Sequence, residues 1–335
     1  MPRPEKPKIE SKARPRAPFE INGVMAPAGK LTQVELRLAR LPTGMWMSLP
    51  VGVLHGRHEG PVIWVSAAIH GDELNGVPII RHLLDAIDPR HLSGTVLAVP
   101  VVNVQGLIQE SRYLPDRRDL NRCFPGSKRG SSAAQLAHLF MTEIVARCEL
   151  GLDLHTGSGG RTNLPQLRCD LDEPGTLRLA REFGAPLVLH SRLRDGSLRA
   201  AARELDKIVL VYEAGEASRF SIRAIEIGFE GALRVMKALG MIEDQLEPVE
   251  VAPRISRASS WVRARRTGFC EMKVRLGTEV AEGDAVAVVF DALGRDRSSV
   301  KAKHHGIVIG HVTSPLVHRG DAIAHIAEIP EIVGK

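Results

Sequence analysis

A strand–helix–strand pattern between residues 62 and 102 restricts what this chain can fold into more than any other feature. Residues 62–69 form an uninterrupted apolar run, which predicts a buried strand. Residues 76–87 then place apolar side chains at helical spacing, and residues 95–102 form a second apolar run. Strands that alternate with helices form a mostly parallel sheet with both faces covered. We therefore expect an α/β domain.

The same alternation continues downstream and defines the expected domains. Further helices are predicted at 131–148, 177–183 and 220–239, and short alternating pieces such as 33–38 predict early strands. We expect one α/β domain over residues 19–250. Residues 1–18 are basic and rich in proline without an apolar segment, so we interpret them as a flexible tail rather than a signal peptide.

The last part of the chain, residues 256–335, has a different sequence pattern. Short β-like pieces alternate with glycine, and residues 280–287 repeat as residues 317–324. Each copy predicts a strand, a Gly-Asp turn and another strand, a pattern similar to the barrel-sandwich fold of biotinyl and lipoyl carrier domains. A carrier needs a lysine on the hairpin between the halves, but the predicted hairpin, 291–297, contains none. We therefore expect a small all-β domain that is structural or acts as a lid.

Composition and charge limit which kinds of molecule the chain is expected to bind. The net charge is +6 and the sequence pI about 9.3, yet only 4% of residues are aromatic and the arginines are scattered. No nucleic-acid-binding module is recognisable, so the charge favours anionic small substrates. No apolar run approaches the ~20 residues of a membrane helix. The widely spaced cysteines suit reduced thiols in the cytoplasm; they are Cys123, Cys148, Cys169 and Cys270.

Two apolar strands are followed by side chains that bind zinc well. His70 and Glu73 come after the strand at 62–69, and His155 ends the apolar stretch that starts at Leu152. Open α/β sheets place their ligands at the carboxyl ends of strands. A catalytic zinc usually has three protein ligands and one open position. Each residue alone is more often a surface or core side chain, but together they predict one zinc per chain.

The residues between and after these ligands supply further chemistry. The segment 111–126 is dense in arginine, whose planar fork binds carboxylates, and the Asn121–Arg122 pair suits a substrate carboxylate. A second arginine can stabilise a developing oxyanion. Glu213, in the apolar strand at 207–216, suits a general base for water that zinc activates. The alternative interpretation of the segment 111–126 is a solvated basic loop. The alternative interpretation of Glu213 is a surface glutamate at a strand end.

Four motifs in order resemble the succinylglutamate desuccinylase/aspartoacylase family, relatives of the zinc carboxypeptidases, over most of the chain. They are His-Gly-Asp-Glu at 70–73, Arg-Tyr at 112–113 with Asp-Leu-Asn-Arg at 119–122, Asp-Leu-His-Thr-Gly at 153–157, and Glu-Ala-Gly at 213–215. The resemblance implies a three-layer α/β/α domain with a mostly parallel or mixed sheet. It also implies the site residues: zinc on His70, Glu73 and His155, Glu213 as general base, Arg112 on the scissile carbonyl, and Asn121 with Arg122 on the substrate carboxylate.

One departure concerns the arginine at the scissile carbonyl. The stretch between Arg112 and Asp119 is slightly longer than in the family, so Arg118 competes with Arg112 for the oxyanion role. Tyr113 supports Arg112, because the Arg-Tyr pair matches there. Arg168, which follows the third ligand, is a candidate to recognise charge on the acyl group.

The expected reaction is hydrolysis of a small N-acyl amino acid by a cytoplasmic zinc amidohydrolase. A zinc carboxypeptidase acting on short peptides is the first alternative, since the same metal site would serve it. A non-catalytic binding protein is the second, although the intact site residues argue against it. We expect no nucleic-acid or membrane partner. The sequence leaves open the acyl group, the amino acid, the physiological metal and whether the protein is a homo-oligomer.

Overall fold

The computed structural model describes residues 16–243, 246 and 252–329. Of the tail expected at 1–18, residues 1–15 therefore lie outside the described part. The strands of the larger, N-terminal part are β1 (Phe19–Ile21), β2 (Val24–Ala26), β3 (Lys30–Arg40), β4 (Trp46–His55), β5 (His58–Ala67), β6 (Ser93–Val99), β7 (Leu150–Gly157), β8 (Arg161–Cys169), β9 (Leu187–His190) and β10 (Ile208–Glu216). Its helices are α1 (Gly76–Ala86), α2 (Val104–Ile108), α3 (Ser132–Glu143), α4 (Thr176–Phe183), α5 (Leu198–Arg203) and α6 (Ile222–Ala238), with 3₁₀ turns η1 (Leu120–Arg122) and η2 (Val145–Arg147).

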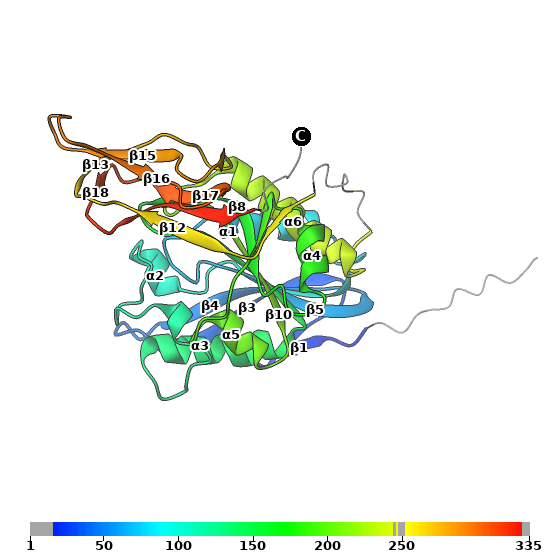
Figure 1. Cartoon of the computed structure of the whole chain (residues 1–335). Coiled ribbons are helices and arrows are strands. Elements are labelled where there is room, and N and C mark those ends of the chain that lie inside the picture. The colour runs from blue at the N-terminus through cyan, green and yellow to red at the C-terminus, as the bar shows by residue number, and fades with distance from the viewer. Residues whose placement is uncertain (1–15, 244–245, 247–251, 330–335) are drawn as a thin grey trace, which may run out of the picture.

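The strands form a mixed sheet with the predicted parallel strands at its centre. β5 runs parallel to both β6 and β7, and β7 runs parallel to β10. On one side β4 and β3 continue the sheet in antiparallel orientation, and on the other side β8 is antiparallel to β10. The chain thus has the mixed α/β architecture expected from its alternating pattern (Figure 1).

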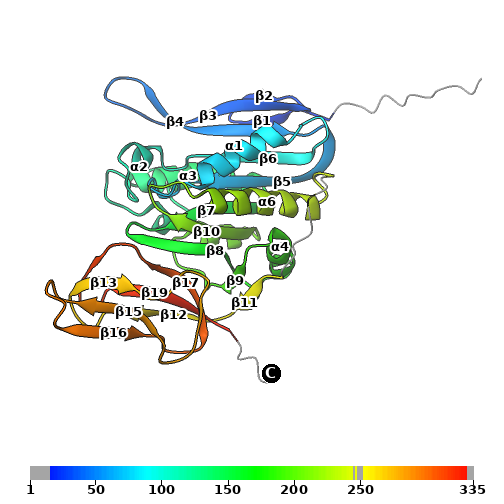
Figure 2. The same cartoon turned by 90° about the horizontal axis from the view of Figure 1, so that it is seen from above.

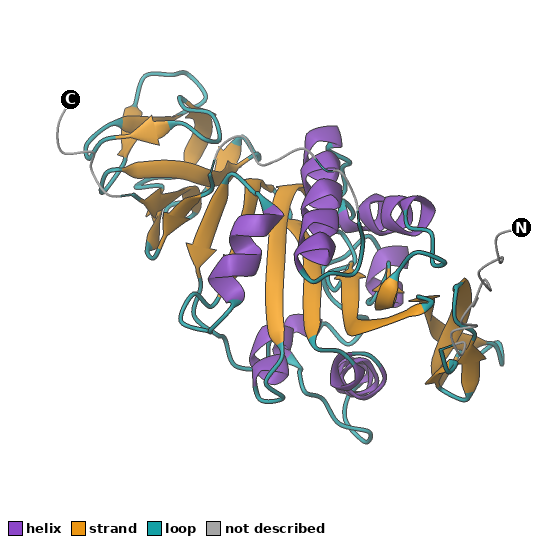
Figure 3. Cartoon of the chain, turned by 90° about the vertical axis from the view of Figure 1, so that its right-hand side faces the viewer, coloured by secondary structure: helices purple, strands orange, loops and turns teal. Residues whose placement is uncertain are grey.

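Helices cover both faces of this sheet and make three layers (Figure 3). α1, α4 and α6 pack on one face, where the buried side chains of α1 meet those of β5 in one apolar cluster. α3 and α5 pack on the other face against a second cluster around Trp64, which is fully buried. Among the described residues, no helix combines the length and apolar character that crossing a bilayer requires.

The predicted helix at 131–148 is shorter in the structure. α3 begins after Ser131, whose hydroxyl accepts a hydrogen bond from the backbone N–H of Ala134, as a helix cap should. It ends at Glu143, and Ile144, with φ −113° and ψ −67°, is its C-cap residue. The short turn η2 then leads the chain into β7. The helical spacing of apolar residues that predicted the helix therefore extends past the end of α3 at Glu143.

The C-terminal part is an all-β unit, as expected. Its strands are β11 (Arg254–Ser256), β12 (Ser259–Arg263), β13 (Gly268–Met272), β14 (Glu279–Val280), β15 (Ala285–Phe290), β16 (Arg297–Lys301), β17 (Gly306–Val312), β18 (Leu316–Val317) and β19 (Ala322–Glu328). A four-stranded sheet, β16-β15-β13-β18, and the strands β12, β19 and β17 enclose a common apolar core. Figure 2 shows this unit beside β8 and β9, at the opposite end of the molecule from β3.

The internal repeat has a physical basis in its two turns. The backbone N–H of Ala281 donates to Asp284 Oδ2 at 2.8 Å, and that of His318 donates to Asp321 Oδ2 at 2.7 Å. The glycine before each aspartate, Gly283 or Gly320, has a positive φ of 90° or 94° that favours glycine. The same Gly-Asp turn is therefore built twice.

The two parts share one continuous sheet, which the sequence pattern did not indicate. β17 pairs with β8 through residues 310–312 and 161–163, so the main strand order runs β12-β19-β17-β8-β10-β7-β5-β6-β4-β3 within a 13-stranded sheet. β9 pairs with the other half of the same edge of β8, and β11 extends β9. β8 is thus the strand at which the C-terminal unit joins the α/β part.

Candidate metal centre and pocket

The side chains predicted to hold metal meet at the carboxyl ends of the central parallel strands. β5 stops at Ala67, and Ala68 then adopts φ 50°, an uncommon value for a residue with a side chain, as the chain turns toward His70. Gly71 lies so close to the backbone of Gly106 that a Cβ would overlap it at 2.0 Å. The tight loop after β5 therefore depends on glycine at position 71.

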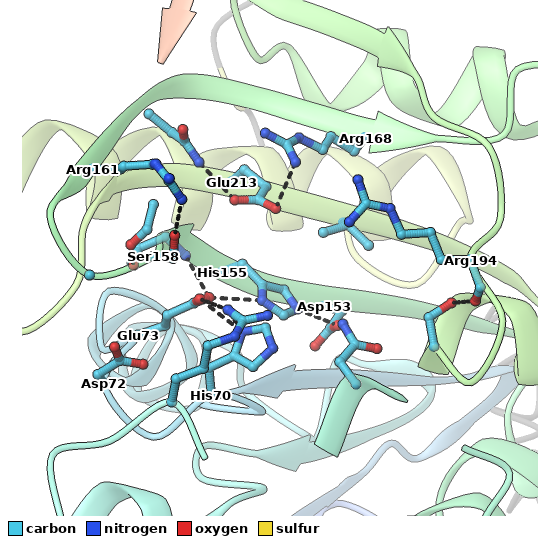
Figure 4. Close-up of a pocket in the computed structure, with 18 of the residues that line it drawn as sticks. His70, Asp72, Glu73, Asp153, His155, Ser158, Arg161, Arg168, Arg194 and Glu213 are labelled. Atoms are coloured by element: carbon cyan, nitrogen blue, oxygen red, sulfur yellow. Dashed lines mark hydrogen bonds and ion pairs between the residues drawn. The ribbon is translucent and has the colours of Figure 1, made fainter. Parts of the chain in front are cut away.

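His70, Glu73 and His155 converge on one point, as Figure 4 shows. His70 Nδ1 lies 2.8 Å from Glu73 Oε1, and His155 Nδ1 lies 2.8 Å from Glu73 Oε2. All three residues are buried, and one donor atom of each lies within 4.8 Å of the others. The structure therefore brings together the three side chains that the sequence predicted as ligands.

Each imidazole is held from behind by an aspartate. His155 Nε2 lies 2.7 Å from Asp153 Oδ2, and the other oxygen of Asp153 accepts a hydrogen bond from Ser66 Oγ at 2.9 Å. His70 Nε2 lies 3.3 Å from Asp119 Oδ1. Metal-binding histidines almost always present their second nitrogen to such a partner, which orients the ring and raises its basicity.

The electrostatics of this cluster favour a positive charge between its side chains. Burial alone would lower the pKa of both histidines, but the adjacent carboxylates outweigh it and raise the pKa of His70 and, more strongly, of His155. Burial would likewise raise the pKa of Glu73, but the two histidines hold it well below its usual range. The pocket therefore favours an ionised carboxylate facing a cation.

These observations fit a zinc ion. Two imidazole nitrogens and a carboxylate make a His₂Glu donor set, which is one of the ligand sets of catalytic zinc sites. Both Nδ1 atoms face the carboxylate, whereas both Nε2 atoms face the supporting aspartates, so the donor atoms all point to the same side. The residues present suit the metal without rearrangement of the rings.

Arg112 borders the metal centre, whereas Arg118 does not. Arg112 Nη1 lies 3.2 Å from Glu73 Oε1, and its Nη2 lies 2.8 Å from Asp119 Oδ2. Arg118 is 61% exposed, pairs at 4.0 Å with Asp116 and is outside the pocket lining. The geometry thus favours Arg112 of the two arginines for a role at the scissile carbonyl.

Glu213 lies beside the metal centre through strand pairing. It is the register partner of His155 between the parallel strands β10 and β7, and neighbouring strands lie about 4.8 Å apart. Its Oε2 accepts a hydrogen bond from Asn163 Nδ2 at 2.8 Å, and its Oε1 lies 3.5 Å from Arg168 Nη1. The predicted general base and the predicted acyl-group reader are therefore partners in an ion pair.

These groups line a pocket of about 830 Å³ that is rich in arginine. Asn121 belongs to the lining, and its Oδ1 accepts a hydrogen bond from the backbone N–H of Leu198, which fixes the direction of the amide. Seven arginines line the pocket: Arg112, Arg122, Arg161, Arg168, Arg194, Arg199 and Arg263. Such a concentration of cations favours an anionic ligand.

The C-terminal unit forms part of the pocket wall. Trp261 of β12 and Ala322 of β19 both belong to the lining. The ring of Trp261 stacks on His325 with 4.5 Å between centroids, and the guanidinium of Arg161 lies 5.3 Å from the Trp261 ring. The aromatic wall is therefore held rigidly on both sides.

Sequence reasoning missed several residues of the site. Asp153 carried a usable signal, because it is two residues before His155 on a strand and so shares its face. Asn75 links the metal loop to β10, donating to the carbonyl of Ala214 and accepting from the N–H of Ser221. Asn163 and Trp261 carried no signal, since only the pairing of distant strands brings them to the pocket.

Comparison with known proteins shows the family of this chain. Residues 59–239 match the model of the succinylglutamate desuccinylase/aspartoacylase catalytic domain. The N-alpha-acetyl-L-2,4-diaminobutyric acid deacetylase of Halomonas elongata is 30% identical over 302 residues, which cover 85% of this chain and 87% of that protein.

Solved structures with similar folds include two bacterial proteins. A succinylglutamate desuccinylase/aspartoacylase from Rhodobacter sphaeroides superposes with a TM-score of 0.80 and 28% identity, covering 89% of this chain and 95% of that one. The product-bound ectoine utilization protein EutE from Ruegeria pomeroyi has a TM-score of 0.82 at 23% identity, covering 93% and 99%. The second likeness shows the fold alone.

Proposed function

Because this chain belongs to the succinylglutamate desuccinylase/aspartoacylase family, we propose that it is a zinc-dependent hydrolase that cleaves the amide bond of a small N-acyl amino acid. The observation that carries this proposal is the buried His70–Glu73–His155 cluster with a carboxylate on the adjacent strand. Zinc bound there supplies a Lewis acid that acidifies water and polarises a carbonyl.

The residues of the chain divide the remaining work. Glu213 accepts a proton from the attacking water and returns it to the departing amine. Arg112 stabilises the oxyanion that develops on the scissile carbonyl. Asn121 and Arg122 hold the carboxylate of the amino-acid part. Arg168 pairs with Glu213 and also lines the pocket, so it can orient Glu213 and contact the substrate. We propose that Arg168 also recognises charge on the acyl group.

The charge of the pocket narrows the proposed substrates. The name of the Halomonas elongata relative includes diaminobutyric acid, whose side chain carries an amine. Here Arg168, Arg194 and Arg199 line the same pocket as Glu213 and Asn121, and a cleft lined by cations repels a positively charged group. We therefore propose an acidic or neutral amino-acid part rather than a basic one.

The two parts of the chain would share this activity. We propose that residues 19–250 carry the metal and the reacting groups, and that residues 256–335 act as a partial lid over the pocket. The position of Trp261 in the pocket wall supports the second role.

Metal content and amine release test the proposal together. Elemental analysis should find about one zinc per chain in the wild type and none in His155→Ala, whereas Glu213→Gln should keep its zinc but not turn over. Ninhydrin detection of amine across N-acyl amino acids with acidic, neutral and basic side chains would identify the substrate. Release from dipeptides alone would favour a zinc carboxypeptidase, and failure to take up zinc would overturn the enzymatic proposal.

A further inference from the structure

Among the residues that the structure describes, the side chains that contact the carboxylate of Glu213 through a hydrogen bond or ion pair both belong to β8. Asn163 Nδ2 donates to one oxygen at 2.8 Å, and Arg168 Nη1 lies 3.5 Å from the other. Asn163 is 6% exposed, so its amide is shielded from water. A hydrogen bond to a carboxylate in such a place is stronger than one between neutral groups. The direction of the Glu213 side chain thus depends on β8.

An irregularity in β8 puts Asn163 on the required face. The register pairs Glu213 with Gln166 but Gly215 with Asn163, so two steps on β10 correspond to three on β8. Side chains alternate between faces along a regular strand, and one extra residue restores Asn163 to the face of Glu213. Pro165 lies within this stretch and has no N–H to offer the ladder, which suits a bulge.

The C-terminal unit supports Asn163 from the other side. Asn163 pairs with Gly310 of β17, and a Cβ at Gly310 would lie 2.8 Å from Asn163 Oδ1. The amide therefore lies against a position where any side chain would displace it. Gln166, opposite Glu213, donates to the carbonyl of Ile309 at 3.2 Å and adds a second link to β17.

We propose that Asn163 is a positioning residue for Glu213, and that Gly310 of the C-terminal unit keeps the space in which Asn163 can act. This inference rests on the proposed role of Glu213 as the base. It gives the C-terminal unit a function in turnover besides closing the pocket, because β17 determines where the base-orienting amide can lie. The effect should appear in the chemical step, since neither residue is assigned to binding the substrate.

Steady-state kinetics of zinc-loaded variants test the proposal. Asn163→Ala should lower kcat about 10- to 100-fold, the equivalent of losing one hydrogen bond to a charged group, with KM and zinc content unchanged. Asn163→Asp keeps the volume but presents a charged acceptor to Glu213, so it should lower kcat at least as far. Thr162→Ala, which truncates the preceding side chain of β8, is the matched control and should retain the wild-type kcat.

A double-mutant cycle tests the part played by Gly310. Gly310→Ala should lower kcat in the wild-type background but have no further effect in Asn163→Ala, where the displaced side chain is already absent. Equal losses in both backgrounds would overturn the coupling through Asn163.

The outcomes separate this inference from the proposed function. An inactive Glu213→Gln beside an Asn163→Ala with wild-type kcat would overturn only the role of Asn163. A fully active Glu213→Gln would overturn the base assignment and the role of Asn163 with it. If Asn163→Ala fails to fold, the isosteric Asn163→Asp decides: wild-type kcat in that variant would overturn the inference.

Discussion

Replacing Asp153 by asparagine should weaken zinc binding without disturbing the fold. Asp153 is 1% exposed, and its oxygens are engaged at 2.7 Å by His155 Nε2 and at 2.9 Å by Ser66 Oγ. Asparagine has the same shape but no charge, so the imidazole loses the partner that orients it and raises its basicity. Changes at such supporting carboxylates reduce metal affinity by about 10- to 100-fold, equivalent to about 1.4–2.7 kcal/mol.

The matched comparison is Asp119→Asn. Asp119 lies farther from its histidine, at 3.3 Å from His70, and it shares its charge with Arg112 at 2.8 Å. Its replacement should therefore weaken zinc binding less than Asp153→Asn does. Asp88→Asn, at a partly exposed carboxylate that pairs with Arg90, should leave zinc affinity unchanged.

Zinc affinity would be measured by competition with a chelator of known affinity, with circular dichroism as the check on folding. A folded Asp153→Asn protein that binds zinc within twofold of the wild type would refute the reasoning. It would mean that the ring of His155 is oriented by packing alone, and that the carboxylate behind it contributes little to the basicity of the ligand.

Three further experiments test separate parts of the structure. Arg112→Ala should lower kcat about 100-fold or more and Arg118→Ala less than about twofold, and equal losses by steady-state kinetics would contradict the assignment from geometry. Gly151→Ala should lower the free energy of unfolding by about 1–3 kcal/mol in urea titration, because a Cβ would lie 2.0 Å from the buried ring of Trp64. Burial, with nearby arginines, lowers the pKa of His325 to about 3, so the unfolded chain takes up the proton first as pH falls below about 6.5. Between pH 7.5 and 5 the free energy of unfolding of the wild type relative to that of His325→Gln should fall by about 2 kcal/mol. A difference that stays constant over this pH range would contradict the lowered pKa of His325.

The local parts of the fold and of the site could be predicted from sequence. Apolar runs of strand length and apolar side chains at helical spacing identified β5, β7, β10, α1 and α6, because burial requires those periodicities. The candidate ligand pair His70–Glu73 was recognisable because both residues lie in one short loop after a strand. The repeated Gly-Asp turn was equally local, since each copy makes its own hydrogen bonds.

β8 was not recognised as a strand although it joins the two parts of the molecule. Pro165 and an irregular register break the alternation by which strands are identified. β8 pairs with β9, the next strand along the chain, and with the more distant β10 and β17, and nothing in residues 161–169 specifies these partners. The contribution of Asn163 to the site was hidden for the same reason.

The sequence by itself determined which residue types were available at the strand ends, and therefore the class of chemistry. Only the tertiary structure decided which of them act together: Asp153 and Asp119 behind the histidines, Arg112 rather than Arg118 at the metal centre, and Asn163 and Trp261 at the pocket. The physical reason is that metal-binding groups on a strand and its following loop are placed by local backbone geometry. Their supporting contacts come from strand pairing between segments far apart in the chain, which leaves no periodic pattern in either segment.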